Sequence, residues 1–319
     1  MRCLVTAIGS MSAEAVIRAI AGQPDTTVLG CNMHPKDWTA ASRLVERFHH
    51  VPSARDASTY LARVLEICES ERISHVVPLT DPEVDVLSAN RQRFDDIDVT
   101  LCISPEPAIR LARDKLAIHE SFAAHPRIRP IATADLRDAR HPDFPYPMLA
   151  KPRRGRSSEG QVTIQDAASF QFWRERLAAQ DYVVQPFHEG DVFVVDVVRQ
   201  PNGCGSAAMT RRELLRTPSG AGMTVRMQPG HACDALALEV AATLGLHGCV
   251  NIEFLVVDDA PLLMDVNPRF SAGVAFSAMS GYDMASNHLR CFDGGQVAHC
   301  MPPPDRVYAR SLVEHTMQD

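Results

Sequence analysis

The sequence LLMDVNPR, at residues 262–269, carries the strongest signal in this chain for both fold and chemistry. Its apolar residues predict a β-strand, in which successive side chains point to opposite faces. Asp265, Asn267 and Arg269 lie two residues apart, so we expect them on one face. Carboxylate and amide oxygens suit Mg²⁺, which shares its coordination with nucleotide phosphates, and a guanidinium can neutralise a phosphate. The stretch therefore predicts a magnesium–phosphate site.

A second predicted strand precedes this one and offers another carboxylate. The sequence VNIEFLVV, at residues 250–257, contains Glu253, and the short segment DDAP at 258–261 follows it. A short polar loop between two apolar runs predicts a hairpin, so the two strands are expected to pair. A charged rim at a strand end is the simpler alternative, but buried strands seldom carry four such groups without a task.

Bulk composition limits the class of protein. The chain has 319 residues, 45% of them hydrophobic and 22% charged, which is enough for two or three domains of an ordinary globular protein. The net charge of −7 and the lack of a basic run argue against nucleic acid as the main partner. Charges interrupt every apolar run, so we expect no membrane partner, and residues 1–9 look like a first strand rather than a secretory signal.

The nine cysteines are odd in number and include no CxxC pair. Several lie in predicted apolar strands, which favours reduced core thiols and a cytoplasmic location. The thirteen histidines show no HExxH or other paired metal spacing.

Strands and helices alternate in residues 1–104. An alternating order of this kind predicts a small doubly wound parallel sheet. The first loop contains only Gly9 and lacks the three glycines of a dinucleotide fingerprint. Asp81 and Glu83 follow a predicted strand and either cap a helix, which we favour, or help to bind a small ligand. The expected strands are 2–8, 27–31, 73–79 and 99–103, and the expected helices are 12–21, 58–70 and 81–94, with Asp81 as the N-cap of the last.

The remaining chain mixes helices with longer strands. A helical stretch over 104–124 contains Arg113, Asp114 and Lys115, and the proline-rich segment 137–147 predicts a junction between lobes. The further expected strands are 147–152, 161–164, 182–187, 192–199 and 206–214, and the further expected helices are 166–178, 230–244 and 282–292.

Lys151 ends an apolar strand and is followed at once by the glycine- and serine-containing segment RRGRSSEG, at 153–160. A lysine in this position can reach phosphate oxygens, and backbone N–H groups of such a loop can fold over them. The lysine precedes the glycines, so this is not a Walker A loop, and by itself the pattern also fits a plain hairpin.

Taken in order, these motifs resemble the ATP-grasp enzymes, and most closely the carbamoyl-phosphate-synthetase-like branch. The resemblance covers nearly the whole chain. It implies an N-terminal Rossmann-like parallel α/β domain at 1–107, a small ATP-grasp lobe at 108–182 and a large lobe at 183–319. The motifs that carry it are Asp114-Lys115, Lys151 with its loop, VVQPF at 183–187, Glu253, and DVNPR at 265–269.

The resemblance also implies a role for each matched residue. Lys115 and Lys151 would hold ATP phosphates, and Arg269 would act with Lys151 in catalysis by stabilising the transferring phosphoryl group. The remaining expected residues are Gly155, Ser157, Ser158 and Gly160 in a lid, Gln185, Pro186 and Phe187 at adenine, and Glu253, Asp265 and Asn267 as ligands of Mg²⁺, usually two ions, with Mn²⁺ as a substitute.

Two positions depart from the family pattern. Asp265 stands where glutamate is commoner, which shortens the metal ligand by one methylene. Val192 stands where a glutamate often binds ribose, so Asp191 or another group would have to replace it.

The implied activity is ATP-dependent ligation of a carboxylate to an amine through an acyl phosphate, with release of ADP and phosphate. Both substrates would be small molecules, and a homodimer is an open option. Arg211, Arg212 and Gly222 lie in the region that would face the substrate, although solvated charges explain the arginines equally well. A nucleotide-binding regulatory homologue without ligase turnover and a small-molecule kinase remain the alternatives.

Overall fold

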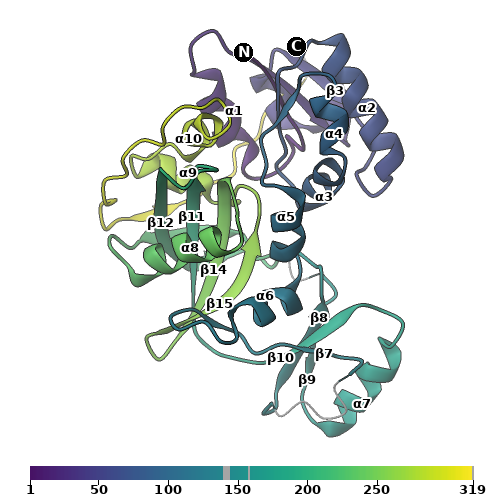
Figure 1. Ribbon diagram of the computed structural model, residues 1–319, viewed down its shortest axis with the longest axis vertical. Coiled ribbons are helices and arrows are strands. Elements are labelled where there is room, and N and C mark those ends of the chain that lie inside the picture. Colours follow the sequence, from purple (N-terminus) through teal and green to yellow (C-terminus); the bar gives the residue numbers. More distant parts are fainter. Residues whose placement is uncertain (139–143, 157–158, 318–319) are drawn as a thin grey trace.

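The computed structural model describes residues 1–138, 144–156 and 159–317. Three β-sheets and the helices around them form a layered α/β molecule (Figure 1). Among the described residues, no helix is long and apolar enough to cross a membrane. All nine cysteines are free, and seven of them are buried, in agreement with the core thiols expected from the sequence.

The first sheet is parallel throughout, which confirms the doubly wound arrangement expected from the alternating elements. Along its central strand, Cys3 and Val5 face one layer of helices while Leu4 faces the other. The sheet has the order β3-β2-β1-β4-β5, with β1 at Arg2–Val5, β2 at Thr27–Asn32, β3 at Arg47–His50, β4 at His75–Val77 and β5 at Thr100–Leu101.

Helices cover both faces of this sheet. The helix α1 (Ala13–Ala21) packs on one face, while α2 (Ala57–Ser70), α3 (Asp81–Ala89) and α4 (Arg91–Asp95) contribute to the core on the other. The helix predicted over 81–94 is thus two helices, with a break at Asn90. Two short 3-10 turns, η1 (Lys36–Trp38) and η2 (Ala40–Leu44), and the edge strand β3 were not predicted.

The long helix predicted over 104–124 is also divided, into α5 (Glu106–Ala112) and α6 (Lys115–Phe122). Asp114 lies between them with an extended backbone, and its side chain accepts hydrogen bonds from the N–H groups of Leu116 and Ala117. This carboxylate satisfies N–H groups that would have no partner at the start of α6, so the chain begins a new helix there.

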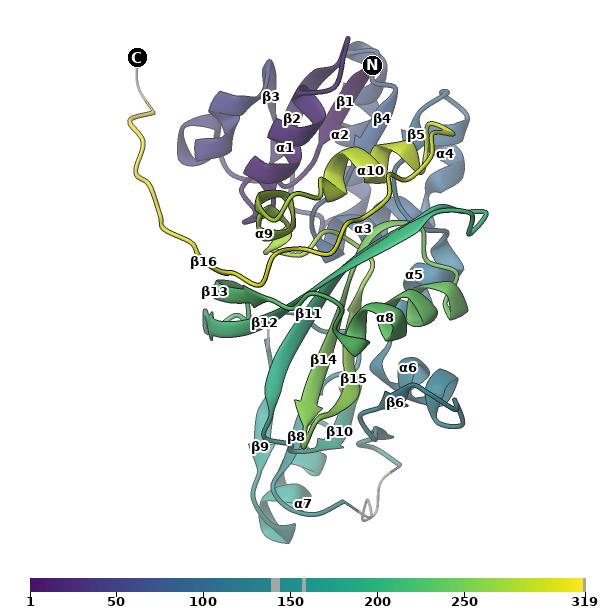
Figure 2. The same ribbon diagram turned by 90° about the vertical axis from the view of Figure 1, so that its left-hand side faces the viewer.

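A four-stranded sheet forms a small lobe at the end of the molecule remote from the first sheet (Figure 2). Its order is β7-β10-β8-β9, with antiparallel pairing, and α7 (Ala167–Arg176) packs against it. The strands are β7 at Ala134–Asp135, β8 at Met148–Pro152, β9 at Val162–Ile164 and β10 at Tyr182–Pro186.

The largest sheet has seven strands, and α8 (Ala232–Thr243) packs on the face that carries Val195, Val197 and Ile252. The opposite face is left for α9 (Val274–Met279), α10 (Met284–Arg290) and a cavity. The order is β16-β13-β12-β11-β14-β15-β6, with β6 at Arg129–Pro130, β11 at Asp191–Arg199, β12 at Ser206–Arg216, β13 at Gly222–Met227, β14 at Gly248–Val257, β15 at Ala260–Asn267 and β16 at Val307–Ala309.

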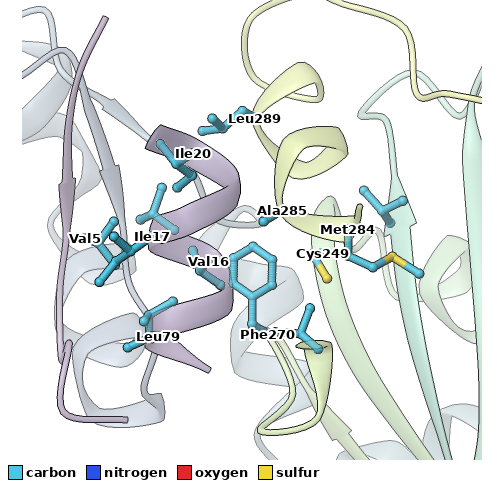
Figure 3. Packing of buried hydrophobic residues seen from close by; sticks show 14 of the residues in the cluster. Val5, Val16, Ile17, Ile20, Leu79, Cys249, Phe270, Met284, Ala285 and Leu289 are labelled. Carbon is cyan, nitrogen blue, oxygen red and sulfur yellow. The ribbon is translucent and has the colours of Figure 1, made fainter. Parts of the chain in front are cut away.

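One hydrophobic core joins the first sheet to the largest sheet. On one side of α1, Ile17 faces Val5 of the first sheet, and on the other side Phe270 lies between α1 and Met284 of α10 (Figure 3). Burial of these side chains fixes the ends of the parallel strands beside the polar face of the large sheet.

Candidate active site

The predicted hairpin exists and sets the geometry of the site. Glu253 of β14 pairs directly with Asp265 of β15, and Asn251 pairs with Asn267. The connecting loop is only Asp258 and Asp259, both in the left-handed region with φ of 47° and 62°. Directly paired residues share a face, so the two carboxylates point the same way as predicted.

The same row continues across two more strands. Val194 of β11 pairs with Glu253 on one side and with Arg211 of β12 on the other. The order Arg211–Val194–Glu253–Asp265 therefore crosses four strands on one face. Arg269 lies just beyond the end of β15 and turns back toward the same face.

A cavity of about 470 Å³ lies over this row. Its walls come from all three sheets. Thr80 and Asp81 follow a strand of the first sheet, Lys151 and Gln185 belong to the small lobe, and the hairpin residues belong to the large sheet. The cavity thus gathers residues that are remote in the sequence, such as Asp81 and Arg269, which are 188 positions apart.

The two predicted phosphate lysines both line the cavity. Lys115 Nζ lies 3.9 Å from Asp265 Oδ1 and donates to the carbonyl oxygen of Gly155 at 3.3 Å. Burial, together with the charge of Lys115, lowers the pKa of Lys151 to about 8. Two ammonium groups held close together in a partly desolvated site attract a polyanion strongly, because the anion relieves the repulsion between them.

The expected metal ligands converge on one point of the cavity. Burial raises the pKa of Glu253, the charge of Arg216 opposes this effect, and the charge of Asp265 adds to it. Glu253 Oε2 accepts from Arg216 at 3.2 Å, while Glu253 Oε1 accepts from Asn267 at 3.4 Å. Two carboxylates and an amide oxygen form a donor set that suits Mg²⁺, and a cation there would relieve the repulsion between the carboxylates.

No group of three histidine, cysteine or acidic residues able to hold a metal ion occurs in the described parts of the chain. A third protein ligand would therefore be the amide of Asn267. This amide now donates to Asn251 Oδ1 at 2.9 Å, and its oxygen accepts from Arg269 at 3.2 Å. Which amide atom faces the metal depends on the hydrogen-bond network around it, so Asn267 can present its oxygen after an amide flip.

Arg269 is held by a residue of the first sheet's helical layer. Its Nε and NH2 donate to the two carboxylate oxygens of Asp81 at 3.1 and 2.9 Å, and its NH1 donates to the Phe270 carbonyl at 3.0 Å. Burial acts to raise the pKa of Asp81, but the charges of Arg269 and Arg113 outweigh it and hold that pKa below its usual value.

This pairing corrects the expectation that Asp81 caps a helix. The N-cap of α3 is Thr80, and Asp81 is the first helical residue. Glu83 has the structural role, because its buried carboxylate accepts from Thr6 Oγ1 at 2.7 Å and from Thr80 Oγ1 at 3.0 Å.

At the other end of the cavity the walls become apolar. Ile131, Leu149, Pro186 and Met264 line this region, which suits a flat aromatic base. Gln185 is buried there, and its amide donates to Thr133 Oγ1 at 2.7 Å.

Two expectations at this end need correction. Phe187 is 40% exposed and is not among the lining residues, and its N–H already donates to the Pro147 carbonyl at 3.0 Å. Asp191, the expected replacement at ribose, instead pairs with Arg212 at 2.7 Å on the outside. His188 lines the cavity and is better placed than either residue.

The lid is described only in part. Ser157 and Ser158 lie outside the described residues, while Gly155 and Arg156 line the cavity. Gly160 has a φ of +71°, and a Cβ there would lie 2.6 Å from the Tyr182 hydroxyl, which donates to the Gly160 carbonyl at 3.0 Å. Position 160 therefore requires glycine.

The three expected substrate residues separate. Arg211 and Gly222 line the cavity. Arg212 follows Arg211 in the same strand, so it points to the opposite side, where it pairs with Asp191. Sequence reasoning missed Arg216 and Glu213, although Glu213 is two residues from Arg211 on the same strand, a spacing that places both on one face.

Two family models match this chain. A family model described as "ATP-grasp in the biosynthetic pathway with Ter operon" matches residues 178–315, and one described as "PylC-like, N-terminal domain" matches residues 7–102. The two models match separate parts of the chain in the expected order, and they confirm the resemblance to ATP-grasp enzymes that its motifs predicted. No curated protein matches the chain.

Solved structures show the same fold at low sequence identity. The biotin carboxylase domain of 2-oxoglutarate carboxylase from Hydrogenobacter thermophilus is 14% identical, with a TM-score of 0.75 over 93% of this chain and 70% of that one. N5-carboxyaminoimidazole ribonucleotide synthetase from Thermus thermophilus is 17% identical, with a TM-score of 0.73 over 96% and 82%. The L-amino acid ligase from Bacillus licheniformis is 14% identical, with a TM-score of 0.71 over 91% and 73%.

Proposed function

We propose that this chain is an ADP-forming ATP-grasp ligase that joins a carboxylate to an amine through an acyl phosphate. The observation that carries the proposal is the convergence of Lys115, Lys151, Arg269 and the Glu253–Asp265 pair on one cavity. The neighbouring structures support it, since they include the biotin carboxylase domain in complex with MgADP and bicarbonate, and an L-amino acid ligase.

The residues divide the chemistry between them. Lys115 and Lys151 would hold the phosphates of ATP, and Glu253, Asp265 and Asn267 would hold Mg²⁺, which would supply positive charge to the phosphate oxygens. A substrate carboxylate oxygen attacks the γ-phosphorus and ADP leaves. The amine nitrogen then attacks the acyl carbon, phosphate leaves and the nitrogen loses a proton. Arg269 stabilises the charge that develops on the transferring group and on the oxyanion.

The extent of the cavity favours a ligase over a kinase. Beyond the phosphate end, the cavity continues along β12 past Arg211 to the turn at 219–222. This extension leaves room for a second substrate beside the activated carboxylate. The intact set of lysines, carboxylates and Arg269 counts against a nucleotide-binding homologue without turnover, because Arg269 has its use in stabilising the transferring group.

Nucleotide analysis tests the reaction type. The purified chain is incubated with ATP, Mg²⁺ and panels of carboxylates and amines. ADP and phosphate are expected as products, and hydroxylamine should trap the acyl phosphate as a hydroxamate when the right carboxylate is present. AMP as the stoichiometric product would rule out this mechanism. Release of ADP that never depends on an amine would favour the kinase, and tight ATP binding without release would favour the regulatory homologue.

The wider biological setting is also part of the proposal. The free, mostly buried cysteines suit a reducing, cytoplasmic setting. We also propose that both substrates are small molecules and that the chain can form a homodimer. Its domains would be an N-terminal domain at 1–107, a small lobe at 108–182 and a large lobe at 183–319.

A further inference from the structure

A second polar cluster lies on the large sheet, apart from the metal ligands. It consists of Asp196 on β11 and of Arg211 and Glu213 on β12. β12 lies two strands from β14, so roughly 10 Å separates the backbones of Arg211 and Glu213 from that of Glu253, and Asp196 lies on the strand between them. The side chains of all three cluster residues are at most 2% exposed.

Arg211 is held by two members of this cluster and by Ser271. Its NH1 donates to Asp196 Oδ2 at 2.8 Å, its NH2 to Ser271 Oγ at 3.0 Å and its Nε to Glu213 Oε1 at 3.2 Å. A guanidinium with three nitrogens engaged cannot offer a free fork to a substrate carboxylate. The expectation that Arg211 captures the substrate in this way is therefore not met by the structure.

Glu213 has one carboxylate oxygen without a hydrogen-bond donor among the described residues. Its Oε2 is buried and has no hydrogen-bond partner among the described residues, although Glu213 lines the cavity. Asp196 Oδ1 is also unpartnered within the described part of the chain, but Asp196 does not line the cavity. A buried carboxylate oxygen without a donor costs stability, so its retention at a cavity wall indicates a ligand that supplies the donor.

Gly222 keeps room for this oxygen. A Cβ at position 222 would lie 2.1 Å from Glu213 Oε2, and Gly222 also lines the cavity. Any larger residue would push the carboxylate out of its present position. The glycine on β13 therefore allows the unpartnered oxygen on β12 to stay at the cavity wall.

We propose that Glu213 Oε2 receives a primary ammonium group of a substrate, so the second cluster is a subsite for an amine or amino acid. The inference rests on the proposed ligase function and adds the chemical class of one substrate. The charge of Arg216 also acts on Glu213, but its guanidinium donates to Glu253 Oε2 and to the Gly220 carbonyl, so Glu213 Oε2 still lacks a donor. A charged donor makes the stronger hydrogen bond to a carboxylate, which favours an ammonium over a neutral N–H. The charge of Arg310 also reaches Glu213, and Arg310 NH1 is buried without a partner among the described residues. Its NH2 donates to the Ala272 carbonyl and its guanidinium lies over the Phe276 ring, an arrangement in which it makes no hydrogen bond to Glu213.

The test compares matched probes in the presence of saturating ADP and Mg²⁺. The probes are L-alanine, L-serine, L-lysine and L-glutamate, each paired with its Nα-acetyl derivative, which has lost the α-ammonium charge. Affinity is measured by calorimetry. At least one free amine should bind wild type, and its acetylated partner should bind roughly ten- to hundredfold more weakly. Glu213→Gln should remove that difference while leaving ADP affinity unchanged.

Arg212→Gln is the matched control, because Arg212 lies on the same strand but pairs with Asp191 outside the cavity. It should behave as wild type. If Glu213→Gln does not fold, Gly222→Ala replaces it, since the new methyl group displaces the same carboxylate. The wild-type comparison of free and acetylated probes stands without either variant.

The outcomes separate this inference from the proposed function. Ammonium-selective binding that depends on Glu213, but without ADP release from ATP, supports the subsite and removes the ligase proposal. Amine-dependent ADP release that is equal in wild type and Glu213→Gln supports a ligase and overturns the subsite. Failure of every free amine to bind better than its acetylated partner also overturns it.

Discussion

Lys151 shows how one side chain can be tuned by its surroundings. It ends β8 opposite Val183 of β10, and burial together with Lys115 brings its pKa down to about 8. A bound polyphosphate favours the ammonium form and raises that pKa again. Above a pH of about 8 the free Lys151 side chain is neutral, so it should take up a proton when nucleotide binds in the absence of metal.

This gives the first prediction. Below about pH 7 the free and bound lysine are both charged, so ADP affinity should not depend on this group. Above about pH 8 affinity should fall, by up to tenfold per pH unit, because binding must then take up a proton. Calorimetry of metal-free ADP binding across this range measures it. Lys151→Met should bind weakly at every pH and melt near the wild-type temperature; an unchanged pH profile in that variant would contradict the assignment.

Asp81 is a positioning residue for Arg269, and this is the second prediction. Asp81→Asn removes the charge that orients the guanidinium bidentately. We expect kcat to fall roughly ten- to hundredfold with little change in KM for ATP, because misplacement of a catalytic group costs about that much. Asp85→Asn is the control, since Asp85 pairs with Arg113 but not with Arg269. If Asp81→Asn and Asp85→Asn had equal kcat and KM values, Asp81 would not position Arg269.

Asp265 carries the third prediction. Asp265→Asn leaves the size of the ligand nearly unchanged but takes a charge from the metal site. The Mg²⁺ concentration for half-maximal activity should rise about tenfold or more, because the hard cation loses a carboxylate. A titration with Mg²⁺ measures this, with the melting temperature as the check on folding. Unaltered Mg²⁺ dependence would place the metal elsewhere.

At the scale of elements, strand pairing explains the site better than any single motif. The β14–β15 hairpin aligns Glu253 with Asp265, and β11 carries the same row to Arg211. The loop between β8 and β9 lies across the cavity from this row, where Gly155 accepts from Lys115. A nucleotide bound between them would contact both elements at once.

The fourth prediction concerns this loop. Arg154 and Arg156 are trypsin sites beside the glycines and serines that would wrap phosphate oxygens. An ATP analogue with Mg²⁺ should suppress cleavage at both arginines. Cleavage at exposed Arg306, which is not among the residues that line the cavity, should stay constant and serves as the internal control. Equal cleavage at Arg154 and Arg156 with and without nucleotide would contradict the lid.

At the scale of the whole molecule, the first sheet and the large sheet share a core. The helix α1 packs on α9 and α10, and Phe270, the residue after Arg269, is buried between them (Figure 3). The N-terminal sheet is therefore part of the framework that holds Asp81 against Arg269, rather than an appended unit.

The fifth prediction follows from this shared core. Ile20→Ala and Leu289→Ala should each lower the free energy of unfolding by about 2–5 kcal/mol, because each leaves a cavity between the two sheets. Denaturant unfolding followed by fluorescence and by circular dichroism should show one coincident transition. Leu312→Ala, at a side chain 77% exposed, should change stability by less than about 0.5 kcal/mol. Two separated transitions in wild type would show that the sheets unfold independently.

Local pattern was enough to determine much of this protein. The alternating order of strands and helices predicted the parallel sheet. A short polar loop between apolar runs predicted the hairpin, and the period of a strand predicted the shared face of Asp265 and Asn267. The order of motifs identified the ATP-grasp family. The same reasoning predicted one helix where the structure has α3 and α4, and one where it has α5 and α6. The backbone leaves the helical conformation at Asn90 and Asp114, and apolar periodicity does not reveal this.

Only the tertiary structure decided which polar groups meet. The partner of Arg269 is Asp81, 188 residues away, and Arg216 reaches Glu253 from another strand. It also decided that Arg211 is internally paired, that Arg212 faces outward, and that one oxygen of Glu213 stays without a partner among the described residues at the cavity wall. These facts depend on burial and on contacts between remote segments, so they appear only when packing of the hydrophobic core has brought the three sheets together.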